Sequence, residues 1–285
     1  MNNEQHILAC VSRSRLAEHI VDYAAWAAQR VAAPLELLHL IEHHTGHGAG
    51  GDRSGAIGVD AQEQLLSKLT ADDEQSARLL REGAREYLQR LRQRALAAGA
   101  ERVDGRLRHG EISETLAEVS SAARLVVVGR HAAAAADKDS GGDIQAMVRA
   151  ARAPVLAVPG PFRPPERVLL AFDGGAASRR SVQMMAASAL FQGLQIEILM
   201  SGADTAAASR ALQDAQGQLQ AARLQVEARL VQGELPELIG AALAQRSIDL
   251  LVMGSYSHSP LRSLLKGSTT TQLLRAFPIP TLLMR

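Results

Sequence analysis

The sequence predicts an α/β fold made of two consecutive units, each with a parallel sheet covered by helices on both faces. Short apolar runs alternate with segments of helical periodicity, which is the pattern of βαβ units. The same order of segments then occurs a second time. A chain of 285 residues is long enough for one or two domains, so the repeat favours two.

The first unit alternates strands and helices from its beginning. The apolar run "HILACV" at 6–11 precedes a helical pattern, and "DEQSARLLREGAREYLQRLRQRALAAG" carries apolar residues at helical spacing opposite a charged face. The expected strands are 6–11, 34–40, 103–108, 124–129 and 154–158, and the expected helices are 15–31, about 74–98, 112–122 and 143–151.

The second unit repeats this order. "RVLLAFD" at 167–173 matches "HILACVS" at 6–12, and "DLLVMGS" at 249–255 matches "RLVVVGR" at 124–130. The proline-containing segment "PGPFRPPE" separates the units and suits an extended, semi-rigid linker. We therefore expect a first domain at 1–158, a linker at 159–166 and a second domain at 167–285.

The segment 42–72 is an insertion in the first unit. Its first part, "EHHTGHGAGGDRSGAIG", is rich in glycine and has no periodicity, so we expect a mobile surface loop. Imidazoles and carboxylates gather there, and these are zinc ligands. A solvated loop is the preferred interpretation, because no pair stands at a fixed spacing. The residues concerned are Glu42, His43, His44, His47 and Asp52.

The composition argues against several classes of partner. The formal net charge is +1 and aromatic residues make up 3%, which disfavours nucleic acid and anionic membranes. No apolar stretch approaches the ~20 residues of a membrane span. The single cysteine, Cys10, lies in an apolar run and cannot form an internal disulfide. No signal peptide is visible, so we expect a cytoplasmic protein.

A glycine pattern near the C-terminus indicates a binding site. Gly254 ends a predicted strand, where a bare backbone lets a ligand approach. Gly267 and Ser268 come where the next helix begins, and a helix N-terminus suits phosphate. Asp173 ends the first strand of the second unit and suits ribose hydroxyls or hydrated Mg²⁺. The alternatives are that Asp173 and Ser268 only cap helices and that the glycines only form tight turns.

These residues resemble the universal stress protein family in its tandem form. The family's signature is Gly, two residues, Gly, nine residues, then Gly with Ser or Thr. Gly254, Ser257, Gly267 and Ser268 match it, with Ser257 in place of the second glycine. The resemblance implies flavodoxin-like or Rossmann-like units with five-stranded parallel sheets. It also implies that the two domains pair about a pseudo-twofold axis through their fifth strands, as in a dimer of single-domain relatives.

The resemblance further implies ATP as cofactor, with or without Mg²⁺, in the second unit. The implied site residues are Asp173, Gly254, Ser257, Gly267, Ser268 and Thr269. The first unit departs from the family pattern: Ser12 replaces the strand-one aspartate, Ala132 replaces the second glycine, and Asp143 adds negative charge near any phosphate. We therefore expect the first unit to bind nucleotide poorly or not at all.

Three functions stay open at this point. The first is a stress-response protein that binds ATP in its second unit and changes shape or protein-partner affinity with occupancy. The second is a nucleotide-free scaffold of the same fold that acts through protein contacts. The third is a slow ATPase, although no nucleophile–base–acid constellation is visible and no metal site is predicted. A homodimer of whole chains is compatible with each.

Overall fold

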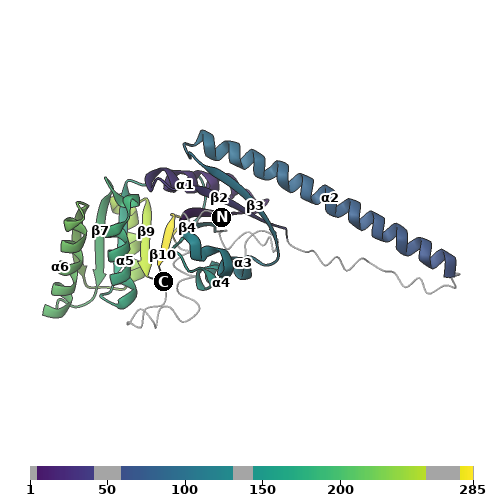
Figure 1. Ribbon diagram of the computed structural model, residues 1–285. Helices are drawn as coiled ribbons and strands as arrows, with labels where there is room; N and C mark the ends of the chain where they lie inside the picture. The colour runs from purple at the N-terminus through teal and green to yellow at the C-terminus, as the bar shows by residue number, and fades with distance from the viewer. Residues whose placement is uncertain (1–4, 42–58, 131–143, 255–276, 285) are drawn as a thin grey trace.

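The first half of the chain forms the expected alternation of strands and helices. The structure, a computed structural model, describes residues 5–41, 59–130, 144–254 and 277–284 (Figure 1). The strands are β1 (His6–Val11), β2 (Leu35–Ile41), β3 (Val103–His109), β4 (Ala123–Gly129) and β5 (Val155–Val158). The helices are α1 (Ala17–Arg30), α2 (Val59–Ala97), α3 (Ile112–Val119) and α4 (Ile144–Ala150), with a 3₁₀ turn, η1 (Ser120–Ala122), after α3.

The second half repeats the order. Its strands are β6 (Arg167–Phe172), β7 (Gln195–Ser201), β8 (Gln225–Val231), β9 (Leu250–Gly254) and β10 (Thr281–Met284). Its described helices are α5 (Ala176–Ala187), α6 (Ala206–Ala221) and α7 (Leu235–Arg246), with a 3₁₀ turn, η2 (Ala189–Phe191), after α5.

All described strands join one ten-stranded sheet in the order β3-β2-β1-β4-β5-β10-β9-β6-β7-β8. The pairs within each half are parallel, as predicted, whereas β5 and β10 pair antiparallel with Leu156 opposite Leu282. The order in one half is therefore the reverse of the order in the other. This confirms the expected pairing of two α/β units about a pseudo-twofold axis through their fifth strands.

Each strand buries alternate side chains on opposite faces of the sheet. On one face Ile7 and Leu170 pack in a core with side chains of α1, α2, α5 and α6. On the other face Leu8 and Leu169 pack with side chains of α3, α4 and α7. Cys10 belongs to this second core and burial raises the pKa of its thiol to about 12, so it is an inert core residue.

The expected surface loop over 42–72 is wrong in its second part. Helix α2 already begins at Val59, and 42–58 lies outside the described residues. The physical reason is local composition: from Val59 to Glu82 the chain contains no glycine or proline and is rich in Ala, Leu, Glu and Gln, which favour helix. In Figure 1 the first turns of α2 project well beyond the sheet.

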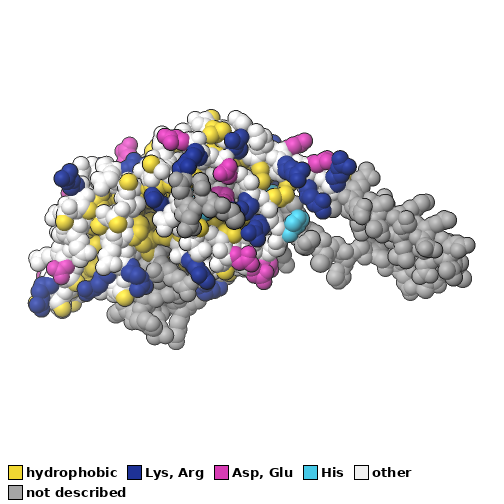
Figure 2. Space-filling model, viewed as in Figure 1, with side chains coloured by type: hydrophobic (Ala, Val, Ile, Leu, Met, Phe, Trp, Pro, Cys, Tyr) yellow, Lys and Arg dark blue, Asp and Glu magenta, His cyan; other side chains and the backbone are white. Residues whose placement is uncertain are grey.

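The surface carries both signs of charge. Figure 2 shows acidic and basic side chains interspersed over the viewed face of the described residues, in keeping with the net charge of +1. Within the described part of the chain, every helix is too short or too polar to cross a bilayer.

Candidate functional site

Asp173 stands at the carboxyl end of β6, where ligands of open parallel sheets bind. Its Oδ1 accepts the backbone N–H of Gly175 at 2.8 Å and the hydroxyl of Ser178 at 2.5 Å. Gly175 is the N-cap of α5, and Gly174 before it has φ +72°, a conformation that glycine adopts without strain. The turn thus fixes the carboxylate beside the start of α5. The same contacts also describe a residue that orders a helix start, which was the alternative interpretation of Asp173.

Gly254 ends β9, the strand next to β6, and it touches the same first turn of α5. A Cβ at Gly254 would lie 2.9 Å from the Ala177 Cβ, 3.1 Å from the Ala177 carbonyl carbon and 3.2 Å from the Ser178 nitrogen. Any larger residue would therefore push β9 and α5 apart. The structure brings Asp173 and Gly254 together at one edge of the sheet, around the N-terminus of one helix.

The other predicted site residues lie outside the described part of the chain. These are Ser257, Gly267, Ser268 and Thr269. The acidic and histidine cluster of 42–52 lies outside it as well. Within the described residues, no group of three or more His, Cys, Asp and Glu side chains is placed to hold a metal ion.

The corresponding turn of the first half is closed by apolar side chains. Ser12 follows β1 as Asp173 follows β6, and Leu16 takes the place of Ala177. A Cβ at Gly129, at the end of β4, would lie 3.2 Å from Leu16 Cδ1 and 3.0 Å from Ile20 Cδ1. Leu16 itself is buried. Leu16 thus fills with apolar atoms the space beside Gly129. In the second half the smaller Ala177 stands there, next to the polar pair of Asp173 and Ser178.

Further side chains cover the same edge of the first half. The Tyr87 hydroxyl donates to the Ser12 backbone oxygen at 2.6 Å, and the Arg13 and Arg90 guanidiniums lie 5.9 and 5.4 Å from the Tyr87 ring centroid. His39, within β2, is buried with Nδ1 2.8 Å from the Val11 oxygen. Burial lowers the pKa of His39 and keeps the imidazole neutral.

Arg130 crosses from one half to the other. It follows Gly129, is 7% exposed, and donates from Nη2 to the Phe277 oxygen at 2.9 Å and to the Ile279 oxygen at 3.0 Å. Both carbonyls belong to the segment that enters β10. Burial lowers the pKa of Arg130 to about 10, so the guanidinium stays charged at neutral pH. Arg130 therefore joins the carboxyl end of β4 to the last strand of the second half.

Two of these features went unnoticed in the sequence reasoning. The exchange of Leu16 for Ala177 is visible once the repeats are aligned on Ser12 and Asp173, so size at that position was the available signal. Arg130 gave no signal of its contacts, because its partners lie far away in the sequence.

Comparisons with known proteins agree with one another. The model of the universal stress protein family matches residues 4–159 and again 165–285. Universal stress protein Slr1230 of Synechocystis is 29% identical over 287 residues, covering 99% of this chain and 100% of that protein. A universal stress protein of Archaeoglobus fulgidus has a TM-score of 0.68 at 17% identity, with 99% of this chain and 97% of that chain covered. A Pseudomonas aeruginosa protein reaches 0.60 at 17% identity over 98% and 92% of the two chains. At these identities the two structures show a shared fold.

Proposed function

The chain belongs to the universal stress protein family, in a form with two tandem units, and from this premise we propose that it serves the stress response by binding ATP in its second half. Occupancy of that site would change the shape of the glycine-containing edge, or its affinity for a protein partner. The first half would act as a structural counterpart without nucleotide.

One observation carries this proposal: the meeting of Asp173 and Gly254 at the start of α5. A carboxylate that is already oriented by Gly175 and Ser178 suits ribose hydroxyls, since little order has to be added on binding. Gly254 lets β9 lie directly against the first turn of α5, and the N-terminus of α5 would offer main-chain N–H groups to a nucleotide. These residues fit the group.

The remaining site residues are proposed from the sequence. Gly267, Ser268 and Thr269 would supply backbone and hydroxyl donors to the phosphates, and Ser257 would replace the second glycine of the motif with a further hydroxyl. Mg²⁺, where bound, would neutralise phosphate charge. The chain's own part is to orient the nucleotide. The sequence places no general base, so ATP hydrolysis is expected to be slow.

Isothermal titration of the full chain with Mg-ATP tests the proposal. We expect one site per chain, and at least about tenfold weaker binding for Asp173→Asn, which is about 1.4 kcal/mol. Gly267→Asp should abolish binding through charge repulsion. Ser12→Ala, at the equivalent turn of the first half, is the matched control and should bind as the native chain does. Absence of heat with the native protein would overturn the proposal.

A nucleotide-free scaffold is the second candidate, and one observation favours it. The contact of Gly254 with Ala177 and the hydrogen bonds of Asp173 are also those expected of residues that only shape the start of α5. Under this reading Mg-ATP leaves the thermal unfolding midpoint unchanged. Under the first reading Mg-ATP raises the midpoint, because a ligand that binds only the folded state stabilises it. A single-turnover phosphate-release assay separates binding from slow hydrolysis.

A further inference from the structure

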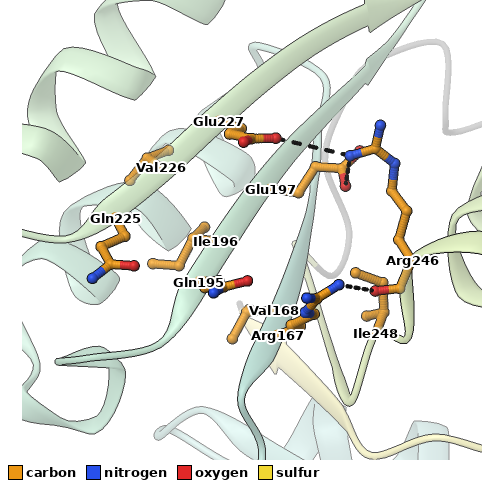
Figure 3. Close-up of a pocket in the computed structure, with 10 residues that line it drawn as sticks. All are labelled: Arg167, Val168, Gln195, Ile196, Glu197, Gln225, Val226, Glu227, Arg246 and Ile248. Atoms are coloured by element: carbon orange, nitrogen blue, oxygen red, sulfur yellow. Dashed lines mark hydrogen bonds and ion pairs between the residues drawn. The ribbon is translucent and has the colours of Figure 1, made fainter.

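A groove of about 390 Å³ lies at the amino ends of β6, β7 and β8 (Figure 3). Asp173 stands at the other end of β6. Arg167, Gln195 and Gln225 are the first residues of β6, β7 and β8 and line its floor. Glu197 and Glu227 follow two residues later on β7 and β8, on the same face. The end of α7 forms the wall with Arg246 and Ile248.

Glu197 is the buried carboxylate of this groove. Its side chain is only 8% exposed. Its Oε2 accepts a hydrogen bond from Arg246 Nη1 at 3.2 Å. Its Oε1 lies 3.4 Å from Arg229 Nη1 but has no hydrogen bond within the described residues. A buried carboxylate oxygen without a donor is costly, so a donor from a bound molecule would stabilise it.

The arginines of the groove also have donors to spare. Arg167 donates from Nη1 to the Arg246 backbone oxygen at 3.1 Å, and Arg246 uses Nη1 for Glu197 and, at 3.8 Å, for Glu227. A guanidinium has five N–H donors. The Nε and Nη2 groups of these two arginines have no hydrogen-bond or ion-pair partner among the described residues, and Figure 3 shows the Arg246 guanidinium beside Glu197.

The charges are mixed, and this mixture selects the ligand. Two carboxylates, Glu197 and Glu227, and two guanidiniums, those of Arg167 and Arg246, line the groove, and Arg229 pairs with Glu197. A simple anion would meet the carboxylates and the negative C-terminal end of α7, and a simple cation would meet the arginines. A small molecule with both charges satisfies each set.

We propose that this groove binds a small zwitterion with an ammonium and a carboxylate on one carbon, which is the chemistry of a free α-amino acid. The ammonium donates to Glu197 Oε1. The carboxylate accepts from the unused donors of Arg167 and Arg246, a charge-assisted pairing. The carboxamides of Gln195 and Gln225 contact the ligand's side chain. This site is separate from the ATP site, and its test does not depend on nucleotide.

The first half provides an internal comparison. Glu36 occupies the position of Glu197, pairs with Arg106 at 3.0 Å, and also has a buried Oε1 without a hydrogen bond among the described residues. However, His6 stands where Arg167 stands in the second half. The first half thus keeps the structural carboxylate–arginine pair and lacks the arginine that would receive a carboxylate.

Isothermal titration of the full chain with the common L-amino acids, one at a time at millimolar concentration, tests the proposal. We expect at least one to bind, with its methyl ester and its N-acetyl form each at least about tenfold weaker, because each lacks one charge. Glu197→Gln should weaken binding to the same extent, and Glu36→Gln should not change it.

Arg167→Gln keeps the test decisive if Glu197→Gln fails to fold, because Arg167 is exposed and its replacement leaves the core intact. It too should weaken binding about tenfold. Two results would overturn the proposal: no amino acid binds the native chain, or the ester and N-acetyl forms bind as well as the parent compound.

Discussion

The two halves are built from the same succession of strands and helices but differ at the carboxyl ends of their strands. In the first half Leu16 and Ile20 pack against Gly129, and Ser12 offers no carboxylate. In the second half Ala177 takes the place of Leu16, and Asp173 is oriented beside Gly254. The difference teaches that one turn decides whether the carboxyl edge is filled by apolar side chains or keeps an oriented carboxylate. The ATP site that we propose for the second half depends on this difference.

Among these tests, Leu16→Ala should have the largest effect on the free energy of unfolding. Leu16 is buried against Gly129, so its truncation leaves a cavity and should lower the free energy of unfolding by about 2–5 kcal/mol. Urea denaturation measures the loss. Opening the space should not create an ATP site, because Ser12 still lacks the carboxylate. The double variant Leu16→Ala, Asp173→Asn should therefore show no additional ATP binding in isothermal titration. Binding by the first half of this variant would contradict our account of the two turns.

Ala177→Leu makes the opposite exchange and gives the second half the leucine of the first. Ala177 is 1% exposed and faces Gly254, so the larger side chain overpacks the turn and should cost about 1–3 kcal/mol. ATP binding should be lost in titration. Ala176→Leu is the control, because Ala176 is exposed on the same turn. Equal effects of the two variants would show that the Gly254 contact is not the cause.

Arg130→Met tests the joint between the halves. The Phe277 and Ile279 carbonyls each lose a buried donor, so we expect a loss of about 1–2 kcal/mol in the free energy of unfolding. Arg124→Met is the control on the same strand, since Arg124 is exposed and its single bond to the Val31 oxygen is 3.3 Å long. The control should change stability by less than about 0.5 kcal/mol. If the denaturation curves of Arg130→Met and of the control coincide, Arg130 does not stabilise the contact between the two halves.

The sequence predicted the strands well because their signal is local. Each apolar run, such as 6–11, carries its own pattern, and the repeat placed every element a second time. The meeting of Asp173 and Gly254 followed from strand ends in a parallel sheet. The start of α2 was missed because the glycines of 42–58 led us to extend the loop over a helical composition. Contacts such as that of Leu16 with Gly129 depend on how distant segments pack, which no local pattern reports.

His39 gives the smallest expected effect, a pH dependence that belongs to the first half alone. In the register of the sheets Met200 occupies its place in the second half. Burial lowers the pKa of His39, with the Arg13 charge acting in the same direction and the Val11 oxygen opposing it. The unfolded chain takes up this proton near pH 6.5, whereas the folded chain resists it until the lowered pKa is reached. Stability should therefore fall as the pH falls between those two values, and be unaffected by His39 above them. His39→Met should flatten this part of the curve, with urea denaturation between about pH 7.5 and about pH 5 as the measurement. The difference between native chain and variant isolates the contribution of His39, and parallel curves would contradict a neutral buried imidazole.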